Sequence, residues 1–156
     1  MQSLARLLRR YPWIVAGLRF FFRLLQARFT AGVVGIVVDD QQRILLVEHV
    51  FHPYCPWGLP GGWVDHQEHP AHAIQRELKE ELGLTVDVGR LIHMNMNEPG
   101  HLDFAYACSA QGQVQSLSYE LLGYQWYRLD ELPRLQKFHY QAIMQLFDQS
   151  SGQKIS

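Results

Sequence analysis

The stretch covering residues 61–84 constrains the chain most, because a loop of glycines and acidic residues leads directly into a charged helix. Its sequence is GGWVDHQEHPAHAIQRELKEELGL. Pro70 suits the first turn of a helix, no helix breaker occurs over 71–82, and Gly83 suits the left-handed residue that ends one. The sequence therefore predicts a helix over 71–82.

Negative charge is clustered on this predicted helix. Three aliphatic residues recur at intervals of four and are expected to face the core: Ile74, Leu78 and Leu82. Glu77, Glu80 and Glu81 then share an adjoining face, where like charges at helical spacing cost about 0.2–0.5 kcal/mol per pair. Carboxylate oxygens are preferred ligands of Mg²⁺ and Mn²⁺. The spacing alone leaves two interpretations, a divalent-cation site or a solvated acidic surface.

The residues around the helix follow one extended pattern, G-x5-E-x7-R-E-U-x-E-E-x-G-U, in which U is aliphatic. The sequence matches every fixed position: Gly62, Glu68, Arg76, Glu77, Leu78, Glu80, Glu81, Gly83 and Leu84. At ordinary residue frequencies, a chance match at one register is on the order of one in a billion. The pattern resembles the Nudix box, and the resemblance extends over most of residues 31–134.

This resemblance implies a fold and a reaction. It implies an α+β protein, an α/β/α sandwich with a mixed β-sheet, that hydrolyses the pyrophosphate bond of a nucleoside diphosphate linked to another group with Mg²⁺ or Mn²⁺. The residues implied as metal ligands are Gly62 through its carbonyl, Glu77, Glu80 and Glu81. Arg76 is implied to hold a carboxylate in position and Glu68 to support the site.

Several positions near the motif are left open by the sequence. Glu120 lies six residues before Trp126, where many members of the family carry an acidic residue, so it is either an extra ligand or general base, or a surface glutamate. His69 stands where a Ser or Thr helix cap is common, and His49 where many members carry Arg. Helix capping and phosphate contact are therefore open at these two histidines.

The substrate is less constrained than the reaction. Pro99 lies 15 residues beyond Leu84, a spacing that resembles ADP-ribose and nucleoside diphosphate sugar hydrolases. The alternatives are a nucleoside triphosphate, a dinucleoside polyphosphate, and a non-catalytic nucleotide sensor. The sequence alone assigns no aromatic residue to base binding, although four near the motif or on the predicted strands could stack a base: Tyr54, Trp57, Trp63 and Phe104.

Composition and order indicate one catalytic domain over residues 31–150. The formal net charge of −1 in 156 residues argues against bulk nucleic acid as a partner. Two cysteines, Cys55 and Cys108, are expected to be reduced and partly buried. Residues 31–40 and 43–50 are predicted to form a β-hairpin around DDQQ. Three more strands and a closing helix after Pro133 are predicted to follow.

Residues 1–30 differ from the rest, since they carry six arginines and no acidic residue. They predict an amphipathic helix broken near Pro12, with Arg19, Arg23 and Gln26 on one face. Packing on the domain or in a homodimer is favoured over peripheral contact with an anionic membrane. Arginines interrupt the apolar run, so neither a membrane span nor a cleaved signal is expected. We expect a cytoplasmic location.

Overall fold

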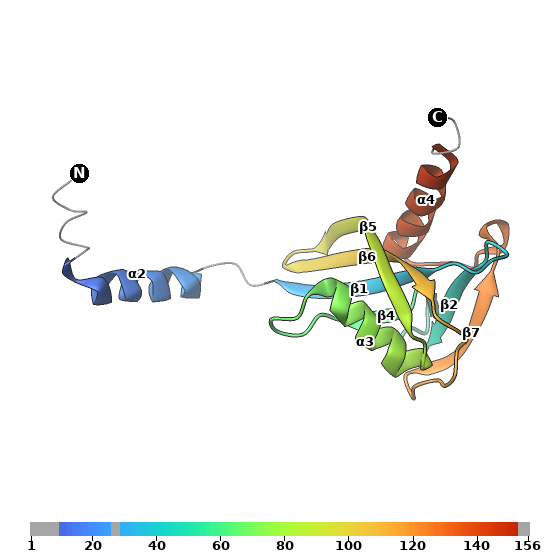
Figure 1. Ribbon diagram of the computed structural model, residues 1–156, viewed down its shortest axis with the longest axis horizontal. Coiled ribbons are helices and arrows are strands. Elements are labelled where there is room, and N and C mark those ends of the chain that lie inside the picture. The colour runs from blue at the N-terminus through green and yellow to red at the C-terminus, as the bar shows by residue number, and fades with distance from the viewer. Residues whose placement is uncertain (1–9, 26–28, 153–156) are drawn as a thin grey trace.

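The computed structural model describes residues 10–25 and 29–152 (Figure 1). Its helices are α2 (Pro12–Leu25), α3 (Pro70–Leu82), the short 3-10 helix η1 (Leu129–Glu131) and α4 (Lys137–Gly152). Its strands are β1 (Thr30–Val37), β2 (Ile44–His49), β3 (Trp57–Gly58), β4 (Gly61–Trp63), β5 (Val86–Glu98), β6 (His101–Ala110) and β7 (Leu121–Tyr127).

The described strands form two sheets. The larger sheet has the order β4-β1-β6-β5, in which β1 and β6 run parallel and the other pairs are antiparallel. The smaller sheet, β3-β2-β7, is antiparallel throughout. Long-range pairing places β1 at the centre of the fold, between β4 and β6, so residues from three parts of the sequence meet across it.

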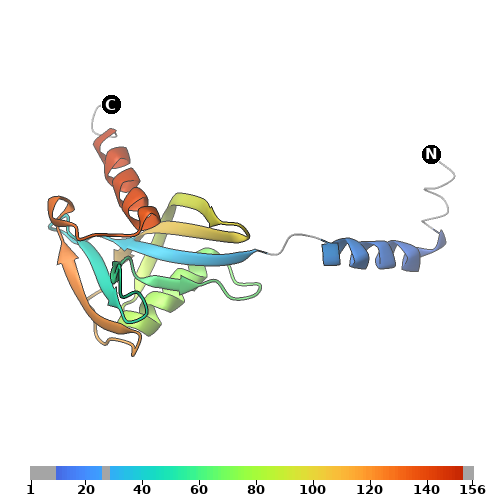
Figure 2. The same ribbon diagram turned by 180° about the vertical axis from the view of Figure 1, so that it is seen from behind.

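Alternation along β1 builds two cores. Val33 and Val37 are buried in one hydrophobic cluster with Leu78 of α3. Ile36, between them, is buried in a second cluster with Ile143 of α4. The two helices therefore cover opposite sides of the sheet, as Figures 1 and 2 show. The predicted α+β fold, an α/β/α sandwich with a mixed sheet, is confirmed.

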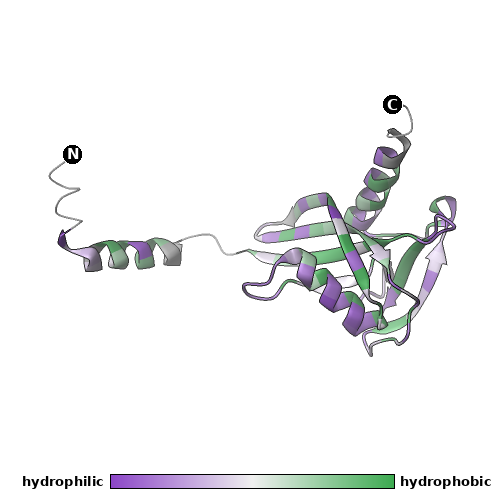
Figure 3. Ribbon diagram, in the orientation of Figure 1, coloured by the Kyte–Doolittle hydropathy of each residue, from purple (hydrophilic) through white to green (hydrophobic). Residues whose placement is uncertain are grey.

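The charged helix is close to its prediction. α3 begins at Pro70 and ends before Gly83, whose φ of 61° is left-handed. The N–H of Gly83 is donated to the carbonyl of Lys79, and the N–H of Leu84 to the carbonyl of Leu78. The three predicted core residues of this helix are fully buried: Ile74, Leu78 and Leu82. Figure 3 shows hydrophilic residues on the rest of its surface. The spacing of the apolar residues thus determines which face of α3 carries the glutamates.

The predicted hairpin of residues 31–50 is wrong. The turn itself forms, because the N–H of Asp39 is donated to the carbonyl of Arg43 and Val38 makes a single bridge to Ile44. Beyond that bridge the two strands separate into different sheets. β1 pairs over eight positions with β6, which lies about 70 residues later in the chain, and this longer ladder replaces the local one. Sequence proximity favoured the wrong partner.

The N-terminal helix α2 lies apart from the domain in both views (Figures 1 and 2). Its aromatic side chains are largely exposed: Trp13, Phe20, Phe21 and Phe22. Packing on the domain, one of the expected arrangements, is therefore not what the described part of α2 does. Arg28 and Gln26 lie outside the described residues. None of the described helices is long and apolar enough to cross a membrane.

Substitution of Gly61 tests whether the close approach of β4 to β1 requires a glycine. Its φ of 151° is a conformation that glycine adopts almost alone, and an added β-carbon would lie 2.1 Å from the carbonyl oxygen of Val33. We expect Gly61→Ala to lower the free energy of unfolding by at least about 1–3 kcal/mol, measured by urea denaturation. Gly123→Ala is the matched control, because its β-carbon would meet nothing nearer than 4.0 Å. Equal stability of the two variants would contradict this account of β4.

Candidate active site

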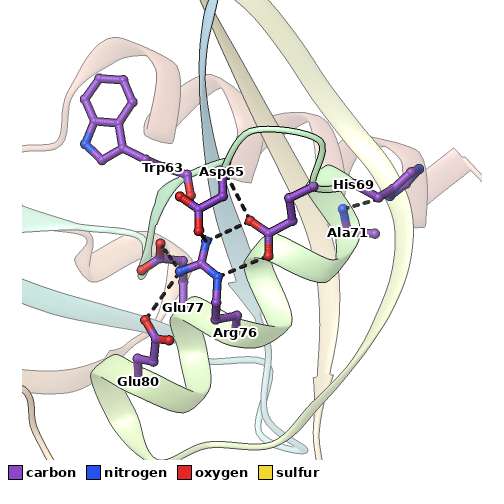
Figure 4. A network of polar contacts seen from close by, with 8 residues as sticks. Trp63, Asp65, His69, Ala71, Arg76, Glu77 and Glu80 are labelled. Carbon is purple, nitrogen blue, oxygen red and sulfur yellow. Dashed lines mark hydrogen bonds and ion pairs between the residues drawn. The ribbon is translucent and has the colours of Figure 1, made fainter.

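Arg76 joins the loop that precedes α3 to the helix itself (Figure 4). Its Nε and Nη2 donate to the two oxygens of Glu68 at 3.1 and 2.9 Å, and Nη2 also donates to the carbonyl of Trp63 at 3.0 Å. Glu68 accepts in addition from the N–H of Asp65 at 3.0 Å. The guanidinium holds the pKa of Glu68 at about 2, so this carboxylate stays ionised and the loop stays attached.

The same guanidinium contacts two of the clustered glutamates. Nη1 of Arg76 donates to Glu77 at 2.9 Å and to Glu80 at 3.3 Å. The sequence led us to expect a divalent cation as the group that relieves repulsion between these carboxylates. In this structure an arginine within the motif also does so, through one nitrogen shared by both. Arg76 therefore contacts carboxylates on the loop and on the helix at once.

Glu81 is the buried member of the cluster, with only 7% of its surface exposed. One oxygen accepts the backbone N–H of Gly61 at 3.0 Å. Burial raises its pKa to about 8, the Gly61 hydrogen bond opposes that shift, and the charges of Glu77 and Glu120 add to it. Burial likewise raises the pKa of Glu77, against the opposing effect of Arg76. Burial and the neighbouring carboxylates thus favour the protonated form of Glu81 while no cation is bound.

These residues fit a divalent cation. The carboxylate of Glu77 lies where a β-carbon on Gly62 would be, with carboxylate atoms 2.5–2.6 Å from that position, so only glycine allows this approach. Carboxylates and a backbone carbonyl are the hard oxygen ligands that Mg²⁺ and Mn²⁺ take. Among the described residues no group of three acidic, His or Cys side chains is already gathered for a metal. Arg76 bonds one oxygen of Glu77 and one oxygen of Glu80, so the second oxygen of each would serve the cation.

A cavity of about 890 Å³ lies beside the cluster. The predicted site residues that line it are Gly62, Glu77, Glu80, Glu81 and Glu120, whereas Arg76 does not line it. Glu120 lies in the turn immediately before β7, far from the motif in sequence, with its side chain exposed. The fold thus brings it to the same cavity, while Arg76 lies behind the carboxylates.

The histidines divide into several groups. His69 caps α3, because its Nδ1 accepts the N–H of Ala71 at 3.1 Å, so an imidazole replaces the usual hydroxyl. His49 and His52 line the cavity with ring centroids 5.5 Å apart. His139 of α4 also lines it, and its Nδ1 accepts the N–H of Leu59 at 3.0 Å. Sequence reasoning missed His139, since nothing local marks a residue that reaches the site from the last helix.

The buried carboxyl of Glu81 makes stability depend on pH. Its ordinary pKa of 4.5 applies to the unfolded chain and the raised value of about 8 to the folded one, so between these values the folded state binds the extra proton. The free energy of unfolding should therefore fall as pH rises from about 5 to about 8, by at most about 1.4 kcal/mol per pH unit from this group. Urea denaturation with a chelator present measures it.

Glu81→Gln should remove that part of the pH dependence, because a glutamine has no proton to lose. Glu131→Gln, at an exposed position on η1, is the matched control and should leave the slope as in the wild type. An unchanged slope in Glu81→Gln would show that Glu81 ionises normally when the protein is folded.

Known proteins resemble this chain in sequence and in structure. The model of the NUDIX domain family matches residues 28–146. A MutT-like protein of Streptomyces ambofaciens is 30% identical over 104 residues, which are 66% of each chain. The matches span 66%, 26% and 35% of the lengths of the first three curated relatives.

Two solved structures share the fold. A UDP-X diphosphatase superposes with a TM-score of 0.69 at 24% identity, over 82% of this chain and 66% of that one. An ADP-ribose pyrophosphatase of Streptococcus suis superposes with a TM-score of 0.64 at 24% identity, over 79% and 91%. The family match over residues 28–146, together with the complete motif along α3, shows that this chain belongs to the NUDIX family.

Proposed function

We propose that the protein hydrolyses the pyrophosphate bond of a nucleoside diphosphate linked to another group, in the presence of Mg²⁺ or Mn²⁺. One observation carries the proposal: three glutamates and a glycine of the motif, together with Glu120 from the turn before β7, border a single cavity. Clustered carboxylates of this kind are costly to the fold, and a cation with bound phosphates would relieve that cost.

The chain's own residues have separate roles in this proposal. Glu77, Glu80, Glu81 and the carbonyl of Gly62 would hold the cation, which neutralises phosphate charge and lowers the pKa of bound water. Arg76 positions Glu77 and Glu80 through its shared nitrogen, with Glu68 anchoring the guanidinium from the other side. Glu120, exposed at the same cavity, is placed either to accept a proton from the attacking water or to serve as a further ligand.

For the substrate we favour a nucleoside diphosphate sugar or ADP-ribose. A second cavity of about 600 Å³ shares Trp63, His101 and Asp103 with the first, so the space extends well past a diphosphate. Pro99 borders this second cavity, in the turn between β5 and β6. A substrate with groups on both sides of its diphosphate suits this extended shape. Nucleoside triphosphates and dinucleoside polyphosphates are the alternatives.

Neutralising either of two glutamates tests the reaction. Glu80→Gln and Glu81→Gln each remove one charged ligand, so both should lower Mg²⁺-dependent turnover at least about 100-fold while the circular dichroism spectrum stays unchanged. Release of nucleoside monophosphate from a panel of nucleoside diphosphate sugars, ADP-ribose and nucleoside triphosphates measures it. Glu131→Gln is the control and should turn over as the wild type does.

The same panel separates the enzyme from a non-catalytic sensor. Turnover of any member with Mg²⁺ supports hydrolysis, and near-normal activity in both glutamine variants would contradict the assigned roles. Tight binding of one nucleotide without its hydrolysis would identify a sensor instead.

We also propose that α2 contacts an anionic membrane surface. Trp13, Phe20, Phe21 and Phe22 are 61–71% exposed, and α2 lies clear of the domain (Figure 1). The six arginines of residues 1–30, with no acidic residue among them, complement negatively charged lipid headgroups. Cys55 and Cys108 are unpaired thiols, which suits a reducing compartment and hence the cytoplasmic side.

Sedimentation with liposomes tests this contact on the full chain. Wild type should sediment with vesicles that contain phosphatidylserine and remain in solution with phosphatidylcholine alone, because the arginines supply charge attraction. Replacing Phe20, Phe21 and Phe22 together by Ser should abolish sedimentation, whereas Tyr140→Ser, on α4, should not. A dimer that the triple replacement dissociates, with no sedimentation of the wild type, would show that α2 is a homodimer contact instead.

A further inference from the structure

Three adjacent strands bring three residues side by side at one end of the larger sheet. Gly32 of β1 is paired with Trp63 of β4 on one side and with Asp103 of β6 on the other. These residues come from three separate parts of the sequence. The central one has no side chain, so the side chains of neighbouring residues can lie close to the backbone of Gly32.

The absence of a side chain at Gly32 is required by its neighbours. A β-carbon there would lie 2.9 Å from Oδ1 of Asp103 and 3.3 Å from Nε2 of His101. Contacts at 2.9 Å are closer than β-carbons make in proteins, so Asp103 would have to move. The glycine therefore makes room for the Asp103 carboxylate and the His101 ring, which occupy the space beside its backbone. We call the exposed Trp63 indole together with these neighbours the Trp63 slot and define it by Gly32, Trp63, His101 and Asp103.

The wall of the Trp63 slot opposite the indole is fixed in place. The His101 ring contacts Thr30 Oγ1 through Nδ1 at 2.8 Å and Asp103 Oδ1 through Nε2 at 3.0 Å, so both ring nitrogens are held. The His101 and Trp63 ring centroids are 5.1 Å apart with an interplanar angle of 61°. An edge-on ring thus supports the indole, whose side chain is still 63% exposed.

The Trp63 slot lies next to the carboxylate cluster. Gly62 is in contact with Glu77, and Trp63 is the next residue of β4, where successive side chains point to opposite sides. Figure 4 shows the indole of Trp63 pointing away from the cluster. Both cavities are bordered by Trp63, His101 and Asp103. A group attached to a diphosphate at Glu77 would therefore reach the slot without leaving the cavity.

We infer that the Trp63 slot binds the nucleobase of the nucleotide substrate, stacked on the exposed indole of Trp63. This inference rests on the proposed function for the diphosphate half of the ligand. An exposed indole that borders both cavities accepts a flat heterocycle, and base-to-aromatic stacking does not require a particular base. Asp103 adds an acceptor at the edge of the slot, where the N–H groups of a base can approach.

Binding of AMP and ribose 5-phosphate to the Mg²⁺-loaded protein, measured by calorimetry, tests the inference without turnover. The two ligands differ only in the base. Wild type should bind AMP about 10- to 100-fold more tightly than ribose 5-phosphate, the range expected for one stacked base. Trp63→Ala should remove most of that preference and leave the affinity for ribose 5-phosphate within about twofold.

Three further variants make the test specific. Trp63→Phe should keep most of the preference, because a phenyl ring still stacks. Gly32→Ala should reduce it, because the added methyl group would displace Asp103 and His101 beside the indole, and thermal unfolding should be measured to confirm that the variant folds. Trp13→Ala removes an equally exposed indole on α2 and should bind as the wild type does.

An undiminished preference for AMP in Trp63→Ala would overturn the inference. An equal loss of affinity for AMP and for ribose 5-phosphate would also overturn it. Failure of the hydrolysis assay has a different signature. If no diphosphate is hydrolysed but the preference for AMP depends on Trp63, the slot stands and the proposed reaction does not.

Discussion

The contact of Arg76 with both the loop and the helix is the constraint on which the site depends. The geometry of this guanidinium is demanding, because its planar fork must reach Glu68 through two nitrogens while a third reaches Glu77 and Glu80. It also contacts the carbonyl of Trp63, the last residue of β4. A lysine could supply the charge, but it could not hold loop, strand and helix at once.

Charge at this site is stabilised unevenly, and that unevenness suits its proposed chemistry. Glu68 is strongly neutralised by Arg76 and has a depressed pKa, whereas Glu81 lies deepest and has a raised one. Glu81 accepts its hydrogen bond from the Gly61 N–H and not from Arg76. The protein thus stabilises the outer carboxylates with its own guanidinium, whereas Glu81 would lose its proton when a cation binds beside it.

Glycines control how closely the backbone approaches these groups. Gly61 adopts a conformation closed to other residues, Gly62 lets Glu77 reach the backbone, and Gly32 makes room for Asp103 and His101 beside Trp63. Within the motif such glycines can be recognised from the sequence alone, since their spacing from the glutamates is fixed. Gly32 lies outside the motif and has no such signal. Its importance follows only from its pairing with Trp63 and Asp103.

The sequence by itself determined those elements that depend only on residues close together in the chain. The spacing of Ile74, Leu78 and Leu82 fixed the buried face of α3, and Gly83 fixed its end. The family, the α+β class and the set of charged residues followed from the same stretch. Short-range periodicity and turn chemistry suffice for these features, because each involves residues within a few turns of one another.

Only the tertiary structure decided which distant segments meet. The predicted hairpin failed because β1 pairs with β6 instead of β2, a choice made by long-range ladders that no local pattern records. The same pairing brings Gly32 beside Asp103, and the packing of α4 brings His139 to the cavity. The histidine cap at His69 also became evident only from geometry. Which strands pair depends on how the faces of all strands are buried together. The sequence of one strand therefore does not fix its partner.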